Sequence, residues 1–314
     1  MTAFDLITMG RVSVDIYPLQ TGVGLEDVET FGKYLGGSPT NVAVAAARHG
    51  RRAAVITRTG ADPFGRYIHR ALAGFGVDDR FVTEVPGLPT PLAFCEIFPP
   101  DDFPLYFYRY PKAPDLQIEA AELDLAAIAE ARLFWATVTG LAEEPSRTAT
   151  LAALAAHPGP TVLDLDYRPM FWSSAAAARA EVTRALAHAT IAVGNVEECE
   201  VAVGERDPYK AAEALLRRGL ELAIVKMGPK GVLAATEGQI VEIPPREVAV
   251  VNGLGAGDAF GGALCHGLLA GWPLDRTLAF AGAAGAIVAS RLACSSAMPT
   301  SAEVETLLAG EGVA

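Results

Sequence analysis

The sequence is poor in cysteine, and its four cysteines are scattered over 314 residues. No two of them show the Cys-x-x-Cys spacing on which zinc and redox sites depend. Their scatter does not indicate the disulfide framework of a secreted domain either. We therefore expect buried thiols in a reducing cytoplasm at Cys95, Cys199, Cys265 and Cys294.

Long apolar runs are also lacking. Although 51% of the residues are hydrophobic, no stretch has the length that spans a bilayer. The segment from Met1 to Gly10 lacks the basic flank and apolar stretch of a signal peptide. The sequence thus predicts a cytoplasmic protein without a membrane partner.

Basic residues are few, since 25 Lys and Arg stand against 37 Asp and Glu, for a formal charge of −12. No run of basic residues with interleaved aromatics is present, so nucleic acid is not the expected partner. The chain is long enough to bury a sizeable core. A globular enzyme acting on a small molecule is the favoured interpretation.

From residue 133 onward, apolar runs and helical patterns alternate, which predicts a parallel sheet covered by helices. The expected strands span 133–138, 161–165, 190–193 and 221–226. The expected helices span 145–156, 174–188, 196–203 and 208–218.

The two ends of the chain carry further elements. Expected before residue 133 are strands at 4–9, 11–17 and 53–58, helices at 39–49 and 65–75, and a hairpin of 93–98 with 105–110. The turn signal of that hairpin is Pro99-Pro100-Asp101-Asp102. After residue 226 come strands at 232–235 and 239–243 and a Gly/Ala-rich helical region at 256–290.

The strongest motif is a glycine-rich turn that opens into an apolar helical stretch at Gly255-Ala256-Gly257-Asp258. Backbone N–H groups at such a turn can stabilise a phosphoryl group in transfer. A carboxylate beside them can accept the proton of an attacking hydroxyl, so Asp258 is the candidate general base. The alternative is an Asp that only complements the dipole of a helix.

A second motif is Gly36-Gly37-Ser38-Pro39-Thr40-Asn41. Its double glycine can bring the backbone and the Asn41 amide against the hydroxyls of a polar ligand. The alternative is an ordinary strand-to-helix turn, with Ser38 or Thr40 as the N-cap and Pro39 at the first helical position.

Together, the two motifs and their spacing resemble those of the ribokinase-like (PfkB) carbohydrate kinases, over nearly the whole chain. The resemblance implies an α/β fold: one three-layer α/β/α kinase domain over residues 1–314 with a mostly parallel central sheet. It implies a small β-sheet lid formed by about 11–35 and 90–112, through which two subunits would pair as a homodimer. The implied ligands are a sugar or sugar acid, ATP, Mg²⁺ and, in some members, K⁺.

The resemblance extends to smaller segments. The segment from Gly10 to Asp15 is similar to one in which the family's Asp binds sugar hydroxyls. The segment from Asn195 to Glu198 is similar to a motif that holds magnesium through water, which suits a hard cation that keeps its waters. A helix N-cap at Asn195 with Glu198 at the capping-box position is the alternative, and it is compatible with that role.

The turn that follows strand 221–226 resembles the nucleotide side of the family's site. The implied ATP-binding residues are Lys226, Gly228, Lys230 and Gly231. The alternative is a Pro-Gly turn with solvated lysines.

Two arginines point to an acidic substrate. The segments around Arg109 and Arg168 resemble those of keto-deoxy sugar acid kinases, and Arg offers a bidentate fork to a carboxylate. Arg168 follows a strand at the edge where open α/β sheets bind ligands. Either arginine could instead form a surface ion pair.

Within that group, the segments are most similar to the kinases of 5-dehydro-2-deoxy-D-gluconate, an acid of inositol catabolism. Kinases of 2-dehydro-3-deoxygluconate, or of neutral sugars such as ribose or fructose, are the alternatives. Two departures concern the ligands. Asn252-Gly253 replaces the Asp-Thr that is usual in the family, which argues against a monovalent-cation site. Gly282 replaces an Asn that is common in the family on the helix beside the adenine.

Two other functions compete. A dinucleotide-dependent oxidoreductase would need Gly-x-Gly-x-x-Gly after the first strand, which Gly10-Arg11-Val12 does not supply. A non-catalytic sugar-binding protein would not need a base, so the presence of Asp258 argues against it.

Overall fold

The computed structural model of the chain describes residues 4–310. Its central sheet has nine strands in the order β13-β12-β11-β10-β9-β8-β1-β4-β5, and only β12 and β13 run antiparallel to their neighbours. These strands are β1 (Leu6–Met9), β4 (Ala53–Gly60), β5 (Val82–Val85), β8 (Leu133–Thr137), β9 (Thr161–Asp164), β10 (Ile191–Asn195), β11 (Leu222–Lys226), β12 (Val232–Ala235) and β13 (Ile240–Ile243).

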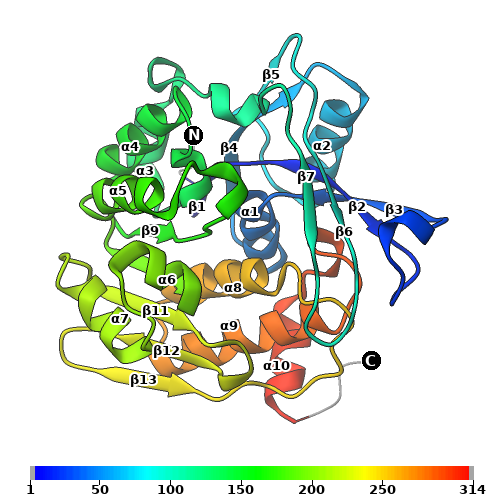
Figure 1. The fold of residues 1–314 in the computed structure, drawn as a ribbon. Helices are drawn as coiled ribbons and strands as arrows, with labels where there is room; N and C mark the ends of the chain where they lie inside the picture. Colours follow the sequence, from blue (N-terminus) through cyan, green and yellow to red (C-terminus); the bar gives the residue numbers. More distant parts are fainter. Residues whose placement is uncertain (1–3, 311–314) are drawn as a thin grey trace.

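Helices cover both faces of this sheet, which gives three layers (Figure 1). One layer holds α1 (Ser38–Arg48), α2 (Pro63–Gly74), α8 (Ala256–Ala270), α9 (Leu274–Ala289) and α10 (Ser301–Leu308). The other holds α3 (Leu125–Glu130), α4 (Ser146–Ala156), α5 (Ala175–Leu186), α6 (Val196–Val203) and α7 (Pro208–Leu216).

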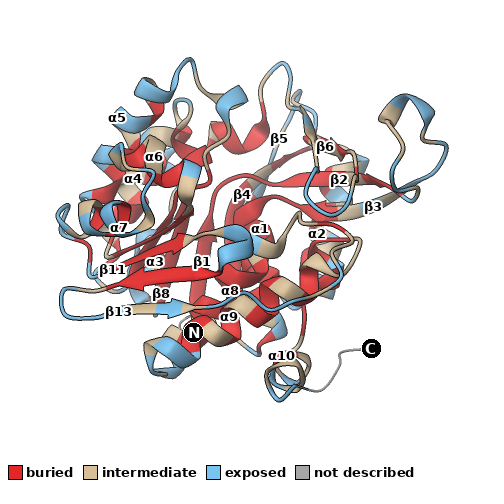
Figure 2. Cartoon of the chain, turned by 60° about the horizontal axis from the view of Figure 1, so that its bottom comes forward, coloured by how far each residue is buried: buried red, intermediate tan, exposed pale blue. Residues whose placement is uncertain are grey.

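The strand side chains alternate between the two helix layers, as the period of two in a strand requires. In β8, Leu133 and Trp135 belong to the core on the α1–α8 side, whereas Phe134 and Ala136 belong to the opposite core. The central strands are therefore buried on both faces (Figure 2). Such strands are near-continuous apolar runs, which explains why they were predictable.

A second, four-stranded sheet stands at the side of the body, at the right of Figure 1. Its order is β3-β2-β6-β7, formed by β2 (Ser13–Pro18), β3 (Phe31–Gly36), β6 (Leu92–Cys95) and β7 (Leu105–Tyr108). The α/β class with a large, mostly parallel sheet and a small second sheet is thus confirmed. So is the hairpin, because β6 and β7 pair antiparallel.

The structure contains two strands and two α-helices that the sequence patterns did not reveal, namely β3, β5, α3 and α10. Each is short, and β3 and β5 expose several of their residues, so they lack a continuous apolar run. The helical region at 256–290 is two helices, because α8 ends at Gly271 and Pro273, which has no N–H to donate, precedes α9. Within the described residues, no helix combines the length and apolarity needed to cross a membrane.

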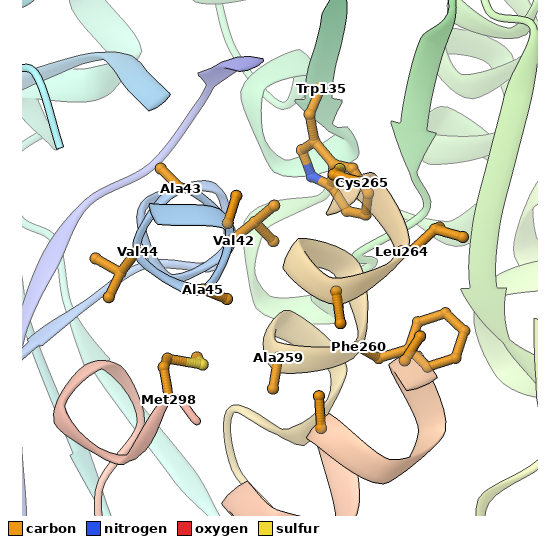
Figure 3. Packing of buried hydrophobic residues seen from close by; sticks show 14 of the residues in the cluster. Val42, Ala43, Val44, Ala45, Trp135, Ala259, Phe260, Leu264, Cys265 and Met298 are labelled. Atoms are coloured by element: carbon orange, nitrogen blue, oxygen red, sulfur yellow. The ribbon is translucent and has the colours of Figure 1, made fainter. Parts of the chain in front are cut away.

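The close packing of α1 against α8 positions the functional residues that follow. A Cβ on Gly262 of α8 would overlap the Cβ of Ala45 in α1, so only glycine permits this approach. Figure 3 shows the two helices side by side, with Val42 of α1 facing α8 and the indole of Trp135 beside Cys265. As a result, the first turns of both helices meet at the same edge of the sheet.

Candidate active site

A cavity of about 1020 Å³ opens at the carboxyl ends of the parallel strands. Its lining comes from residues that follow β1, β9, β10 and β11, from the first turns of α1 and α8, and from the small sheet. Open α/β sheets bind ligands at this edge. The small sheet contributes Ala93, Leu105 and Phe107 to the lining, so that sheet covers one side of the cavity.

The glycine-rich turn forms the N-terminus of α8 inside the cavity. Gly255 is the N-cap with φ +83°, and a Cβ there would lie 2.7 Å from Sγ of Cys294. No side chain among the described residues caps this helix. Its first N–H groups, at Ala256 and Gly257, are therefore available to an anion.

The turn itself is held by Asn252. Its Nδ2 donates to the carbonyl of Leu292 (2.7 Å), and its Oδ1 accepts from the N–H of Leu254 (3.0 Å). Asn252 is fully buried. Both functional groups of this side chain are thus used in fixing the loop before Gly255.

Asp258 lies in the first turn of α8 and contacts the first turn of α1. Nδ2 of Asn41 donates to Oδ2 of Asp258 (2.8 Å), while Oγ of Ser295 donates to Oδ1 of Asn41 (2.6 Å). The Ser295 hydroxyl therefore orients the Asn41 amide so that its NH₂ faces the carboxylate. Burial raises the pKa of Asp258, and the hydrogen bond from Asn41 opposes this shift.

Asp15, on β2, is the second carboxylate on this side. Oγ of Ser13 donates to its Oδ1 (2.8 Å), and Oη of Tyr17 donates to its Oδ2 (3.0 Å). Burial raises the pKa of Asp15, and these two hydrogen bonds act against it. A Cβ on Gly36 would overlap the Asp15 carboxylate, so the absence of a side chain at Gly36 leaves room for Asp15. Gly37, in contrast, lines the cavity itself.

Three further carboxylates and three cations lie between the Asp15 side and the turn after β11. The carboxylates are Asp164, Asp166 and Glu198, and the cations are Arg11, Arg168 and Lys226. Nη2 of Arg168 contacts Oδ1 of Asp166 at 2.7 Å, and Nε of Arg11 contacts Oδ2 of the same carboxylate at 3.4 Å. The Asp166 carboxylate thus lies between two arginines.

These contacts shift the pKa values in opposite directions. Burial acts to raise the pKa of Asp166, but Arg168 and then Arg11 outweigh it and lower that pKa. Burial raises the pKa of Asp164 well above its ordinary value, although Lys226 opposes the shift. Burial acts to lower the pKa of Lys226, but Glu198 and the aspartates raise it, so the ammonium keeps its charge.

Lys226 lies where a phosphate would meet the N-terminus of α8. A Cβ on Gly257 would be 3.2 Å from Nζ of Lys226. Gly228 and Gly231 of the following turn also line the cavity. Lys230 points elsewhere, because it is exposed and is not part of the cavity lining.

Asn195 and Glu198 form a capping box at the start of α6. Oδ1 of Asn195 accepts from the N–H of Glu198 (2.8 Å), and Oε2 of Glu198 accepts from the N–H of Asn195 (2.7 Å). Both residues line the cavity. The remaining Glu198 oxygen, 3.7 Å from Nη1 of Arg168, is a hard donor suited to Mg²⁺ through water. Among the described residues, no cluster of three His, Cys, Asp or Glu side chains could hold a metal ion directly.

The structure separates Arg109 from the other predicted residues. Its Nη2 contacts both Asp115 oxygens, at 3.0 and 2.8 Å, and it lines a second hollow of about 450 Å³ beside β7. Gly282, in contrast, lines the main cavity with open space where a side chain would stand.

Several cavity residues were not singled out from the sequence, notably Arg11, Tyr17, Asp164, Asp166 and Cys294. A signal existed for two of them, because Asp164 ends the strand that precedes Arg168 and Asp166 lies two residues beyond it. Arg11 directly follows the glycine after β1 and could have been found by the same rule. Tyr17 and Cys294 carried no signal, since their contact joins residues 277 positions apart.

Comparisons with known proteins agree with this architecture. The 5-dehydro-2-deoxygluconokinase of Shouchella clausii is 32% identical over 312 residues, covering 97% of this chain and 95% of that protein. A crystal structure of a PfkB protein from Polaromonas sp. JS666 superposes with a TM-score of 0.85 at 26% identity, covering 96% and 99% of the two chains.

A fructokinase from Vibrio cholerae O395, in its fructose, ADP and calcium ion bound form, superposes with a TM-score of 0.84. It is 26% identical, and the match covers 97% of this chain and 99% of the fructokinase. Residues 3–301 match the description "pfkB family carbohydrate kinase". The chain belongs to the pfkB family of carbohydrate kinases.

Proposed function

We propose that the protein transfers the γ-phosphoryl group of ATP to a keto-deoxy sugar acid, namely to C6 of 5-dehydro-2-deoxy-D-gluconate. One observation carries the kinase assignment. The buried Asp258 carboxylate lies in the first turn of a helix whose uncapped N–H groups face the same cavity. A base and an anion-binding turn at one point are what phosphoryl transfer to an alcohol requires.

In this proposal, the acceptor hydroxyl lies between Asp15 and Asp258. Asp258 accepts the hydroxyl proton as the oxygen bonds to the γ-phosphorus. The bond from that phosphorus to its bridging oxygen breaks, and ADP leaves. The N–H groups of Ala256 and Gly257 stabilise the charge on the transferred group, with Gly255 shaping the turn. The small sheet, acting as a lid, excludes water from the acceptor.

The nucleotide would bind along the turn after β11, with its phosphates toward Lys226 and the backbone of Gly228 and Gly231. Asn195 and Glu198 would hold Mg²⁺ through water, and this ion supplies charge neutralisation on the phosphates when bound. Asn252, whose side chain is fully engaged within the loop, offers no free ligand to K⁺. We therefore propose that K⁺ is not required.

The substrate class is supported by the cations and by the relatives. Arg11 and Arg168 both line the cavity and give it the positive charge that favours an acidic substrate. The Shouchella clausii relative is named for a keto-deoxy gluconate. The fructokinase keeps a neutral sugar as the second candidate, since its crystal form holds fructose.

Two further features belong to this proposal. The enzyme would work in the cytoplasm, where ATP is available. It would pair as a homodimer through the outer face of the lid. Along β7, Leu105 and Phe107 line the cavity, so Tyr106 and Tyr108 face away from it and are 44% and 62% exposed. Phe31 and Phe94 extend this apolar face, because Phe94 packs against both Phe31 and Tyr108.

The test is a coupled assay of ADP release by the purified protein. Its substrates are 5-dehydro-2-deoxygluconate, 2-dehydro-3-deoxygluconate, fructose, ribose and a nucleoside, each with ATP and Mg²⁺ and with or without K⁺. We expect the highest kcat/KM for the first acid, without dependence on K⁺. Turnover of neutral sugars alone would reject the acid assignment while keeping the kinase.

A further inference from the structure

This inference rests on the proposed function and names the residue that reads the acid: we infer that Arg11 binds the carboxylate of the substrate. Arg11 follows β1 and lines the main cavity. The residue is only 7% exposed, and its guanidinium, which is incompletely paired, faces the cavity.

The contacts of Arg11 leave one edge of its guanidinium free. Nε donates to Oδ2 of Asp166 at 3.4 Å. Neither Nη atom has a hydrogen-bond partner within residues 4–310. These two nitrogens form the end-on fork that matches the two oxygens of a carboxylate. The geometry therefore provides a vacant bidentate donor at the wall of the cavity.

Phe107 of the lid holds this fork in place. The Arg11 guanidinium carbon lies 5.5 Å from the centre of the Phe107 ring, within the range of a cation–π contact. Phe107 in turn packs edge-on against Phe171 at 5.1 Å. The guanidinium is thus held by Asp166 at its Nε and by the Phe107 ring, over which it lies, before any ligand arrives.

The other arginines do not offer a free fork. Nη2 of Arg168 contacts Asp166 at 2.7 Å, and its Nη1 donates to the carbonyl of Tyr167 at 3.2 Å, so each terminal nitrogen already makes a contact within the protein. Only its Nε lacks a partner, and that atom is enclosed in protein. Arg109 is paired with the Asp115 carboxylate outside the main cavity.

The position of Arg11 suits the rest of the proposed substrate. Burial raises the pKa of both Asp15 and Asp258, and the nearby charge of Arg11 opposes that shift in each case, so all three groups share one region. Lys226 lies instead beside Gly257, where phosphate is expected. A sugar acid whose hydroxyls meet Asp15 and Asp258 would therefore present its carboxylate to Arg11.

The test compares Arg11→Gln, Arg168→Gln and the wild type on two substrates. One is 5-dehydro-2-deoxygluconate, and the other is the neutral ketose in which a hydroxymethyl group replaces its carboxylate. For Arg11→Gln we expect KM for the acid to rise about 30-fold or more, the order for removing one member of a buried charge pair. KM for the neutral ketose should change less than about threefold, because that ligand has no charge to lose.

Arg168→Gln should raise KM for both substrates by a similar factor. The change removes the partner of the Asp166 carboxylate and no contact with the substrate carboxylate. Arg70→Gln, on the exposed face of α2, controls for the loss of one positive charge. If Arg11→Gln does not melt cooperatively, Arg11→Lys replaces it, since it keeps the charge without the fork. For this variant we expect the KM for the acid to rise about tenfold.

An unchanged preference for the acid in the folded Arg11 variant would overturn the inference and leave the acid kinase in place. If only Arg168→Gln loses the preference for the acid over the neutral ketose, Arg168 and not Arg11 binds the substrate carboxylate. If the wild type phosphorylates the neutral ketose but not the acid, the proposed function fails, and the role of Arg11 fails with it.

Discussion

Asp258 owes its position to two hydrogen bonds that begin at Ser295 and pass through Asn41. In the proposed reaction it is the group that takes the hydroxyl proton. We expect Asp258→Asn to lower kcat at least about 100-fold, the order for removing a general base. ATP affinity should stay near the wild-type value, because the nucleotide contacts lie elsewhere. Single-turnover rates and nucleotide titrations measure the two effects, and near-normal turnover would reject the role.

The hydrogen bond between Asn41 and Asp258 leads to a prediction about the pH dependence of the reaction. A base acts only when ionised, and burial raises the pKa of Asp258, so kcat/KM should fall on the acid side at a higher pH than for an exposed aspartate. The hydrogen bond from Asn41 lowers that pKa. Asn41→Leu should therefore shift the acid limb of the pH profile upward by about one unit, the equivalent of one hydrogen bond to a charged group. A downward shift would contradict this assignment.

Individual site residues differ in how visible they are in the sequence. Asp258 and Asn41 stand in recognisable glycine-rich turns, so their types and spacing predicted chemistry. The contact between them joins positions 217 apart and follows only from the packing of two helices. The partners of Arg168 and Arg109 were equally hidden, because which carboxylate neutralises an arginine depends on tertiary contacts.

At the scale of elements, the contact between α1 and α8 determines where Asp258 lies relative to Asn41. Gly262→Val would force these helices apart, because even a Cβ at this position overlaps Ala45. We expect the free energy of unfolding to fall by about 1–3 kcal/mol, the usual cost of overpacking. We also expect kcat to drop, since Asn41 and Asp258 separate.

Urea denaturation and steady-state kinetics measure both effects. The matched control is Gly74→Ala at the end of α2, where a new Cβ meets no atom within 4 Å. That change should leave kcat at the wild-type value. A Gly262→Val protein with wild-type stability and turnover would show that the two helices can separate without affecting the base.

Elements differ in predictability for a physical reason. The strands buried on both faces are apolar runs, and the helices between them carry strong patterns, so both were expected from the sequence. β3 and β5 belong to sheet edges and expose several residues, which removes the pattern. The pairing order of the strands, with β1 between β8 and β4, is a tertiary property that no local pattern contains.

At the scale of the whole molecule, the exposed aromatic face of the small sheet leads to a prediction about the oligomeric state. Tyr108 is 62% exposed on this face. We expect the wild type to elute as a dimer in size-exclusion chromatography with light scattering. Tyr108→Asp should shift it to a monomer, because burying an unpaired carboxylate in an apolar interface is unfavourable.

The control for this experiment is Leu125→Asp, an exposed position at the start of α3 outside the lid, which should remain a dimer. A wild-type protein that is monomeric at micromolar concentration would reject pairing through the lid. The lid would then serve only to cover the cavity.

The bond from Ser295 to Asn41 also has a consequence for protein synthesis. Ser295 follows all nine strands of the sheet in the sequence, and its hydroxyl contacts both Asn41 and the carbonyl of Leu35. A ribosome therefore delivers the whole central sheet and every α-helix except α10 before it delivers the residue that orients the Asn41 amide toward Asp258. A nascent chain can form its sheet early, yet Asn41 and Asp258 lack their final arrangement until Ser295 has emerged.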